Sequence, residues 1–260
     1  MSNILKEKII ETEKLTPLLF RLTIQSEYIA KNAKPGQFVN IKCCDGIDAL
    51  LRRPISICSV NREQGLFDIV FEVRGRGTEI LSMKKAGDTL DILGPLGKSF
   101  YVPDENSKIA VVGGGIGVFP LLFLLKEIKC AQKTAFLGFR SFENAVLLDE
   151  FQKESDSVYI TTDDGSMGSK GFVTEILEQK LEEKSYDVIY SCGPVAMMKR
   201  VAEAAQKYGV KCQVSLEERM GCGIGACLVC VCKTRKDEGW EYSHVCSDGT
   251  VFWSSEIIFD

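Results

Sequence analysis

Histidine is almost missing from this 260-residue chain, in which His244 is the only one. Histidine is the side chain whose charge most readily changes near neutral pH, so catalysis by histidine proton transfer is excluded unless His244 performs it. Blocks of basic residues are missing too, and the formal net charge is −4. We therefore expect no nucleic acid as a partner.

Uninterrupted apolar segments are also missing. Residues 2–8 carry charges and no apolar stretch, so we expect no secretion signal. The longest apolar run, residues 109–125, is broken by glycines and by Pro120, and it indicates a buried strand–turn–helix, not a membrane span. Eleven cysteines in such a chain favour metal chemistry in a reducing cytoplasm over disulfides. The expected protein is cytoplasmic, with no membrane partner.

Four of these cysteines are regularly spaced towards the C-terminal end. Four residues separate Cys222 from Cys227, two separate Cys227 from Cys230, and fifteen precede Cys246. This C-x4-C-x2-C…C spacing is that of plant-type ferredoxins, in which four thiolates hold a 2Fe–2S cluster. Small residues between the cysteines leave room for backbone N–H groups to turn towards the sulfurs: Gly221, Gly223, Gly225 and Ala226. We therefore expect these four cysteines to be the cluster ligands.

Two other interpretations of the cysteines remain open. A structural zinc site usually has two close C-x2-C pairs, and here the second pair is missing. Reduced cysteines can also simply pack in a core. Residues 228–232 alternate like a strand, which predicts that the spare thiol of Cys232 is a small core residue.

The first hundred residues have the pattern of an all-β domain. Short alternating segments separated by turn signals predict an antiparallel barrel or sandwich. The expected strands cover residues 18–24, 37–41, 55–58 and 67–73, with turns at 35–36 and 94–97.

A polar linker at 103–106 precedes a different pattern. Apolar strands then alternate with helical segments, which predicts a doubly wound parallel sheet covered by helices on both faces. The expected strands are 109–112, 134–138, 158–161, 187–190 and 211–216, with helices from about 117, through 147–151, and over 172–183 and 195–208. The expected domains are 1–102 (β-barrel), 103–216 (α/β) and 217–260 (cluster segment).

One candidate cofactor segment opens a strand of the barrel half. Arg53 can bridge a diphosphate bidentately, and the Ser56 hydroxyl can hydrogen-bond an isoalloxazine nitrogen; Pro54 and Ile55 lie between them. Alone, this string also fits an ordinary surface arginine. A following glycine turn strengthens the flavin interpretation, because Gly77 and Thr78 can begin a short helix whose N–H groups face phosphate.

A second candidate segment lies between a strand and a helix of the α/β half. Its glycines are Gly113, Gly114, Gly115 and Gly117. A dinucleotide diphosphate binds at such a helix N-terminus, although the string is not a strict G-x-G-x-x-G and a packing role is the alternative. Cys192 ends a parallel strand at the ligand-binding edge, where its thiol either lies beside a nicotinamide or is simply buried.

In this order, the R-x-x-S, G-x-x-T, G-G-G-I-G and C-G-P strings resemble the ferredoxin–NADP reductase superfamily. With residues 217–227 and the Cys246 segment added, the whole chain closely resembles the electron-transfer subunits of bacterial dihydroorotate dehydrogenase type B. The resemblance implies FAD, NAD and a 2Fe–2S cluster on Cys222, Cys227, Cys230 and Cys246. It implies FAD contacts from residues 53–56, Gly77 and Thr78, and from Val70, Phe71 and Glu72.

Two positions depart from the superfamily's pattern. Ile55 replaces the aromatic residue of R-x-Y-S, so flavin stacking from that position is absent. Glu72 is acidic where a basic residue would suit a diphosphate, and the sequence gives no physical reason for it. The sequence also does not separate NAD from NADP. Arg140, after the second parallel strand, could receive a 2′-phosphate, whereas the resemblance implies NAD.

The resemblance implies an electron relay. A separate FMN-bearing catalytic subunit would oxidise dihydroorotate, and this chain would pass the electrons through the cluster and FAD to NAD+, in a complex with two copies of each chain. Ser56 and Cys192 are the expected reaction-site residues. The alternatives are a free-standing NAD(P)H-dependent reductase and a zinc-bearing interaction protein. We expect the loop 221–230 to lie at a partner interface, with Met220, Ile224 and Leu228 as contacts unless they pack internally.

Overall fold

The computed structural model describes residues 3–183 and 185–259, and the chain divides into two units. Unit 1 contains the described residues up to Ser99 together with Glu217–Val231 and His244–Thr250. Unit 2 contains Phe100–Leu216, Cys232–Ser243 and the described residues from Val251 onward. The C-terminal segment that follows residue 216 therefore contributes to both units.

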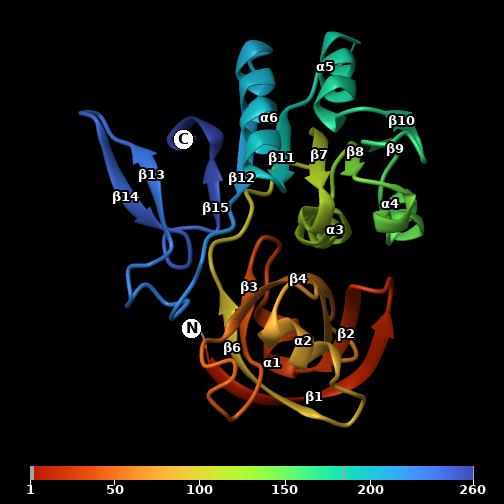
Figure 1. The fold of residues 1–260 in the computed structure, drawn as a ribbon. Coiled ribbons are helices and arrows are strands. Elements are labelled where there is room, and N and C mark those ends of the chain that lie inside the picture. The colour runs from red at the N-terminus through yellow and green to blue at the C-terminus, as the bar shows by residue number, and fades with distance from the viewer. Residues whose placement is uncertain (1–2, 184, 260) are drawn as a thin grey trace. The chain divides into compact units, whose positions relative to one another are not determined.

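Unit 1 is built on a closed antiparallel barrel with the strand order β1-β2-β5-β4-β3-β6 (Figure 1). Alternate residues turn apolar side chains inward, so that Ile24, Ile41, Ile57 and Ile69 are fully buried. The predicted barrel is confirmed. Its elements are β1 (Asn3–Lys14), β2 (Leu19–Gln25), α1 (Glu27–Asn32), β3 (Phe38–Lys42), β4 (Arg53–Asn61), β5 (Leu66–Glu72), α2 (Arg76–Ser82) and β6 (Thr89–Leu96).

The turn predicted at residues 94–97 is wrong over most of its length. Gly94, Pro95 and Leu96 belong to β6, which pairs with both β1 and β3. Proline cannot donate to a ladder, but the register between β6 and β3 shifts between Phe38 and Asn40. A register irregularity of this kind is where a strand accepts proline.

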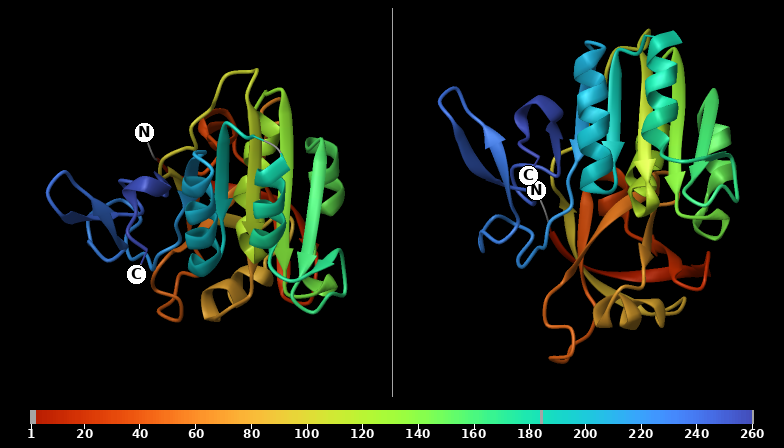
Figure 2. Two further views of the ribbon diagram at one scale, coloured as in Figure 1. Left: turned by 90° about the horizontal axis from the view of Figure 1, so that it is seen from above. Right: turned by 45° about the horizontal axis from the view of Figure 1, so that its top comes forward.

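Unit 2 is built on a seven-stranded sheet with the order β10-β9-β8-β7-β11-β12-β15, in which only β15 is antiparallel to its neighbour. Helices α3 and α4 pack on one face and α5 and α6 on the other (Figure 2), as predicted. The elements are β7 (Lys108–Gly114), η1 (Gly115–Gly117), α3 (Val118–Glu127), β8 (Gln132–Phe139), η2 (Phe142–Asn144), α4 (Leu148–Glu154), β9 (Ser157–Thr162), β10 (Ser169–Lys170), α5 (Val173–Glu183), β11 (Val188–Cys192), α6 (Val195–Lys207), β12 (Lys211–Ser215), β15 (Val251–Trp253) and η3 (Ser254–Glu256).

The C-terminal segment forms a two-stranded sheet of β13 (Val231–Arg235) and β14 (Trp240–His244). The strand predicted over 228–232 therefore begins three residues later. Leu228 has a φ of 57°, in the left-handed region and not in the extended conformation of a regular strand. Cys232 is half-buried in β13 and is not a fully buried core residue. None of the helices within the described part of the chain is long and apolar enough to cross a membrane.

Candidate functional site

The four predicted ligand cysteines come together in unit 1 as two linked pairs. The Cys222 N–H lies 3.3 Å from Cys227 Sγ, and the Cys246 N–H lies 3.4 Å from Cys230 Sγ. The Gly225 N–H reaches Cys246 Sγ at 3.1 Å and joins the pairs. Across residues 3–183 and 185–259, no three Cys, His or acidic side chains converge on one metal-ion position. Two pairs suit a cluster in which each of two irons takes two thiolates.

Backbone N–H groups of the loop point at the first thiol. Ile224, Ala226 and Cys227 donate to Cys222 Sγ at 3.4, 3.2 and 3.3 Å. Burial raises the pKa of the Cys222 thiol, but these donors outweigh burial and lower the pKa to about 6. Donors of this kind stabilise the thiolate, which is the form that binds metal. The loop donors therefore favour the thiolate form of Cys222.

The second pair is in a different environment. Burial, followed by the neighbouring Cys230 thiol, raises the pKa of Cys246 to about 12, although the Gly225 N–H opposes this. Cys230 and Cys246 are both buried, whereas Cys227 is exposed. A metal-bound thiol is deprotonated outright, so a metal at this pair displaces the Cys246 proton.

Glycines shape the loop as the sequence predicts. Gly223 and Gly225 have φ values of 76° and 80°, where L side chains are strained. A Cβ on Gly225 would lie 2.9 Å from the Ser247 hydroxyl, beside the fourth cysteine. Glycine at these two positions therefore lets the loop follow this path without backbone strain.

The cluster loop and the 244–250 turn are fastened to the barrel of the same unit. Asn40 Nδ2, on β3, donates to the Cys222 carbonyl at 3.2 Å. The Thr250 hydroxyl donates to the Gly36 carbonyl at 2.6 Å, and the Lys98 N–H donates to the Gly249 carbonyl. These contacts cannot be predicted from the sequence, because residues so far apart in the chain share no local pattern.

The thiol pairs, the N–H donors and the glycine path together fit a 2Fe–2S cluster held by Cys222, Cys227, Cys230 and Cys246. The apolar groups on this loop face outward. Ile224, Leu228 and Val229 are each more than half exposed, whereas Met220 is only half-buried. Ile224 and Leu228 are thus not packed in the core of unit 1. Val229 is a third exposed apolar residue of this loop.

The predicted flavin segment brings together two groups that can bind a diphosphate. The Arg53 guanidinium lies over the start of α2, where a Cβ on Gly77 would be 2.5 Å from Arg53 Nε. Arg53 Nη1 donates to the Leu51 carbonyl, which fixes the side chain at the start of β4. The glycine therefore lets an arginine and a helix N-terminus meet, and both groups bind phosphate.

The neighbouring predicted contacts have structural roles of their own. The Thr78 hydroxyl accepts from the N–H groups of Arg74 and Gly75 at 3.0 and 3.2 Å, so it holds the turn before α2. Glu72 forms an ion pair with Arg74, which gives its charge a partner that the sequence analysis could not assign. Val70 and Phe71 are buried, so contacts from this strand to a ligand would come from its backbone.

Residues 54–56 alternate between the two faces of β4. Ile55 is buried opposite Val39, which accounts for an aliphatic residue at this position. Pro54 lies opposite Asn40, and Ser56 is half-buried opposite Phe38. The Ser56 hydroxyl therefore lies on the opposite face from the Ile55 core contact.

In unit 2, the glycine turn after β7 packs tightly against the end of β11. A Cβ on Gly117 would lie 2.3 Å from the Cys192 carbonyl oxygen, and one on Gly114 would lie 2.7 Å from Met197 Sδ. Gly113 is paired with Cys192 in adjacent strands. Gly115, with a φ of 55°, has open space around its Cβ position. Gly114 and Gly117 are therefore needed for close packing, whereas the Cβ position of Gly115 faces open space.

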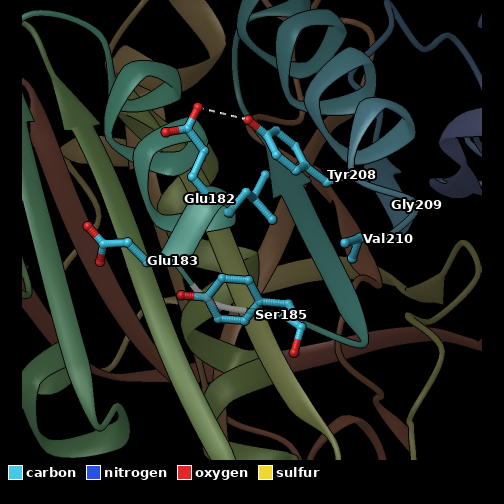
Figure 3. A pocket seen from close by; sticks show the side chains of 8 residues that line it. Glu182, Glu183, Ser185, Tyr208, Gly209 and Val210 are labelled. Carbon is cyan, nitrogen blue, oxygen red and sulfur yellow. Dashed lines mark hydrogen bonds between the residues drawn. The ribbon is translucent and has the colours of Figure 1, made fainter.

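The carboxyl ends of β7 and β11 bring this turn and Cys192 together, as the βα pattern predicts. Cys192 is half-buried there. A hollow elsewhere in unit 2 is lined by the ends of α5 and α6 and the start of β12 (Figure 3). Tyr208 donates to Glu182 at 3.1 Å across it. This hollow lies at the amino ends of the strands and contains none of the predicted site residues.

Three family models match consecutive parts of the chain. An oxidoreductase FAD-binding domain matches residues 4–101, an oxidoreductase NAD-binding domain matches 111–203, and the iron–sulfur cluster binding domain of dihydroorotate dehydrogenase B matches 217–258. FAD-binding, NAD-binding and iron–sulfur-binding domains are therefore present, and the zinc interpretation is not supported.

Solved structures show the same fold. A chain of the NADH-dependent reduced ferredoxin–NADP oxidoreductase, studied for flavin-based electron bifurcation, matches with a TM-score of 0.86 and 33% identity, over 98% of this chain and 90% of that one. A ferredoxin–NADP+ reductase from Neisseria gonorrhoeae with bound FAD and NADP matches with a TM-score of 0.67 and 19% identity, over 79% and 92% of the two chains, and supports the fold alone.

Curated relatives cover the full length. The dihydroorotate dehydrogenase B (NAD(+)) electron transfer subunit of Caldanaerobacter subterraneus subsp. tengcongensis is 40% identical over 98% of both chains. The subunit of the same name from Desulforamulus reducens is 40% identical over 100% of both. The thiol pairs, the arginine at α2 and the glycine turn thus occur in a chain that belongs to the family of dihydroorotate dehydrogenase B electron transfer subunits.

Proposed function

We propose that this chain, in the cytoplasm, carries electrons from a dihydroorotate-oxidising catalytic subunit to NAD+ in pyrimidine synthesis. The catalytic subunit bears FMN, and the complex contains two copies of each chain. The 2Fe–2S cluster and FAD are the carriers within this chain. When bound, a flavin exchanges single electrons with an iron–sulfur cluster and a hydride with nicotinamide.

Each part of the chain has a defined task in this proposal. Cys222, Cys227, Cys230 and Cys246 hold the cluster, and the loop N–H groups stabilise its thiolates. Arg53 and the start of α2 bind the FAD diphosphate, and Ser56 hydrogen-bonds the isoalloxazine. The turn of Gly113, Gly114, Gly115 and Gly117 receives the NAD diphosphate, and Cys192 lies beside the nicotinamide. Residues 1–102, 103–216 and 217–260 remain the proposed FAD, NAD and cluster segments.

The observation that carries the proposal is the arrangement of the four cysteines on the barrel. The Cys222 carbonyl is bonded to Asn40 on β3, and β3 pairs with the flavin segment of β4. The four cysteines and the proposed flavin segment therefore belong to one unit and are linked through β3. Electron transfer needs two carriers that are held close together, and this linkage supports the proposal.

The exposed apolar groups of the cluster loop are the proposed contact with the catalytic subunit. Ile224 and Leu228 are 54% and 60% exposed, and Leu228 has a left-handed φ. Exposed apolar side chains and strained backbone are both concentrated at binding surfaces. Replacing Ile224 with Asp should weaken association while iron and FAD contents remain unchanged. Ile47→Asp is the matched control, because Ile47 is 89% exposed on the β3–β4 loop.

The test is coexpression of this chain with an FMN-bearing dihydroorotate dehydrogenase subunit, followed by size-exclusion chromatography with iron and flavin assays on each peak. We expect one complex with equal numbers of both chains, and dihydroorotate-dependent NAD+ reduction only when both are present. If this chain alone sustained that reaction, or never associated with such a subunit, the proposal would fail. Efficient NADH-dependent reduction of a different redox protein by the isolated chain would instead support a free-standing reductase.

A further inference from the structure

The Met197 side chain packs against two glycines of unit 2. Met197 lies in the first turn of α6, where its N–H donates to the Pro194 carbonyl at 2.9 Å. A Cβ on Gly114 would lie 2.7 Å from Met197 Sδ, and a Cβ on Gly193 would lie 2.9 Å from Met197 Cε. A side chain on either glycine would therefore displace the thioether. The thioether thus occupies the space that these two glycines leave open.

This space lies where the strand order of the sheet reverses. The chain runs outward from β7 through β8 to β9, and then crosses to β11 and β12 on the other side of β7. Gly114 ends β7, and Gly193 follows directly after β11, the parallel neighbour of β7. Ligands of open α/β sheets bind at the carboxyl ends of the strands, at the point of reversal. Met197 is therefore at the place in unit 2 where a ligand is expected.

Two adjacent methionines of α6 have different surroundings. Met198 is 1% exposed and fills the core of unit 2, whereas Met197 is only half-buried. Val195, at the start of the same helix, is 51% exposed. Ligand sites are lined mainly by apolar side chains that remain accessible in a concave edge. A thioether on three rotatable bonds adapts to its neighbour and makes favourable contacts with aromatic rings. The side chain of Met197 is thus suited to an aromatic ligand group.

We propose that Met197 is a binding residue for the nicotinamide ring of NAD, and that its Sδ and Cε form an apolar seat for the ring beside Cys192. The inference rests on the proposed function, because it needs NAD at the glycine turn after β7. Gly114 belongs to that turn and contacts Met197, whereas Cys192 directly precedes Gly193. Met197 forms no covalent bond and transfers no proton. It holds the ring in place.

Two ligands separate the nicotinamide from the rest of NAD. NAD+ carries the ring, and ADP-ribose is the same molecule without it, with the adenine and the diphosphate retained. Both are titrated calorimetrically into the oxidised, cofactor-loaded full chain, in which NAD+ is not reduced. A residue that only supports the glycine turn, or one that contacts the adenine, would affect both ligands alike.

Three variants are compared with the unaltered chain. Met197→Leu keeps the apolar volume but loses the sulfur, so the fold should be retained. Met197→Ala removes the seat. Met198→Leu is the matched control, because it makes the same replacement at the adjacent position, where the side chain is buried.

The NAD+ dissociation constant should rise about threefold in Met197→Leu and roughly tenfold in Met197→Ala. The ADP-ribose dissociation constant should stay within about twofold of the unaltered value in both variants. Met198→Leu should leave both constants unchanged.

Equal weakening of NAD+ and ADP-ribose in the Met197 variants would overturn the inference, because Met197 would then act through the turn or the adenine. Unchanged NAD+ binding in both variants would overturn it as well. If the unaltered chain bound neither ligand, the proposed NAD site itself would fail, so the two failures are distinguishable.

Discussion

At the candidate nucleotide site, the backbone at Gly117 packs against the backbone of Cys192 and Gly193. The substitution Gly117→Ala, which adds one methyl group, tests how much this contact matters. A Cβ on Gly117 would lie 2.3 Å from the Cys192 carbonyl oxygen, 2.4 Å from its carbon and 2.6 Å from the Gly193 nitrogen. Contacts of a real Cβ are essentially never shorter than 3.0 Å, so Gly117→Ala must separate two backbone segments by about 0.7 Å or more. The Cys192 and Gly193 backbone cannot rotate away from the added methyl group as a side chain could.

The expected cost follows from overpacking. Added methyl groups in packed interiors destabilise by about 1–3 kcal/mol, and because backbone must move here we expect the upper half of that range. For a chain of this size, about 2–3 kcal/mol lowers Tm by roughly 4–12 °C. The same displacement moves the turn of Gly113 to Gly117 relative to Cys192, so NADH affinity should fall as well.

The assay is thermal unfolding followed by circular dichroism, with an NADH titration at 25 °C. Gly46→Ala is the control for adding a methyl group, because nothing lies within 4 Å of its Cβ position. Gly115→Ala separates strain from packing: its φ of 55° costs about 1 kcal/mol without a clash. If Gly115 faces the NAD diphosphate, Gly115→Ala should weaken NADH binding more than it lowers Tm. A Tm for Gly117→Ala within 2 °C of the unaltered chain would refute the reasoning.

Three further predictions concern unit 1. Cys227→Ser should remove the cluster and its EPR signal, while FAD remains bound and NADH still reduces a small artificial acceptor. The control, Cys232→Ser, should keep two irons per chain, and two irons in Cys227→Ser would contradict the ligand assignment. Arg53→Ala removes a charge-assisted contact of about 1.5–3 kcal/mol, so the FAD dissociation constant should rise roughly ten- to hundredfold, and an unchanged value would make Arg53 a surface residue. Burial raises the pKa of Asp68, but the Arg21 charge and hydroxyl donors outweigh burial and hold the pKa below its usual value. The stability that this carboxylate contributes is therefore complete above about pH 4 and is lost as the pH falls through its folded-state pKa. Urea unfolding as a function of pH should show this acid loss, and Asp68→Asn should lack it.

The sequence predicts the parts of the fold that have regular hydrophobic patterns. The central strands of both units are recognisable because their buried residues form apolar runs or alternate cleanly. β1 cannot be recognised in the sequence, because Ile4 and Ile10 are exposed and only Ile9 is fully buried along its twelve residues. β6 is obscured by Gly94 and Pro95, which signal a turn in isolation. The barrel can thus be predicted as a class, but not strand by strand.

Some parts of the candidate site can likewise be predicted from the sequence, and others cannot. The four candidate ligand cysteines can be singled out in the sequence because a cluster imposes a spacing along the chain. The ion pair of Glu72 with Arg74 and the bond from Asn40 to Cys222 are not, because they depend on where folded backbone places each side chain. The glycine turn of unit 2 is intermediate: its position is predictable, but only the structure shows which glycines are enclosed and which faces open space.

The discontinuous make-up of unit 1 has a consequence for the order in which the protein matures during translation. The barrel strands emerge from the ribosome first, but Glu217–Val231 and His244–Thr250 follow only after all of Phe100–Leu216 has been synthesised. At about 5–20 residues per second, this interval lasts roughly 6–25 s, during which the Asn40 face of the barrel lacks its cluster loop. Cys246, the last candidate ligand, emerges after the other three. The full set of four thiols is therefore available only near the end of synthesis, and a nascent chain released before Cys246 would lack one of them.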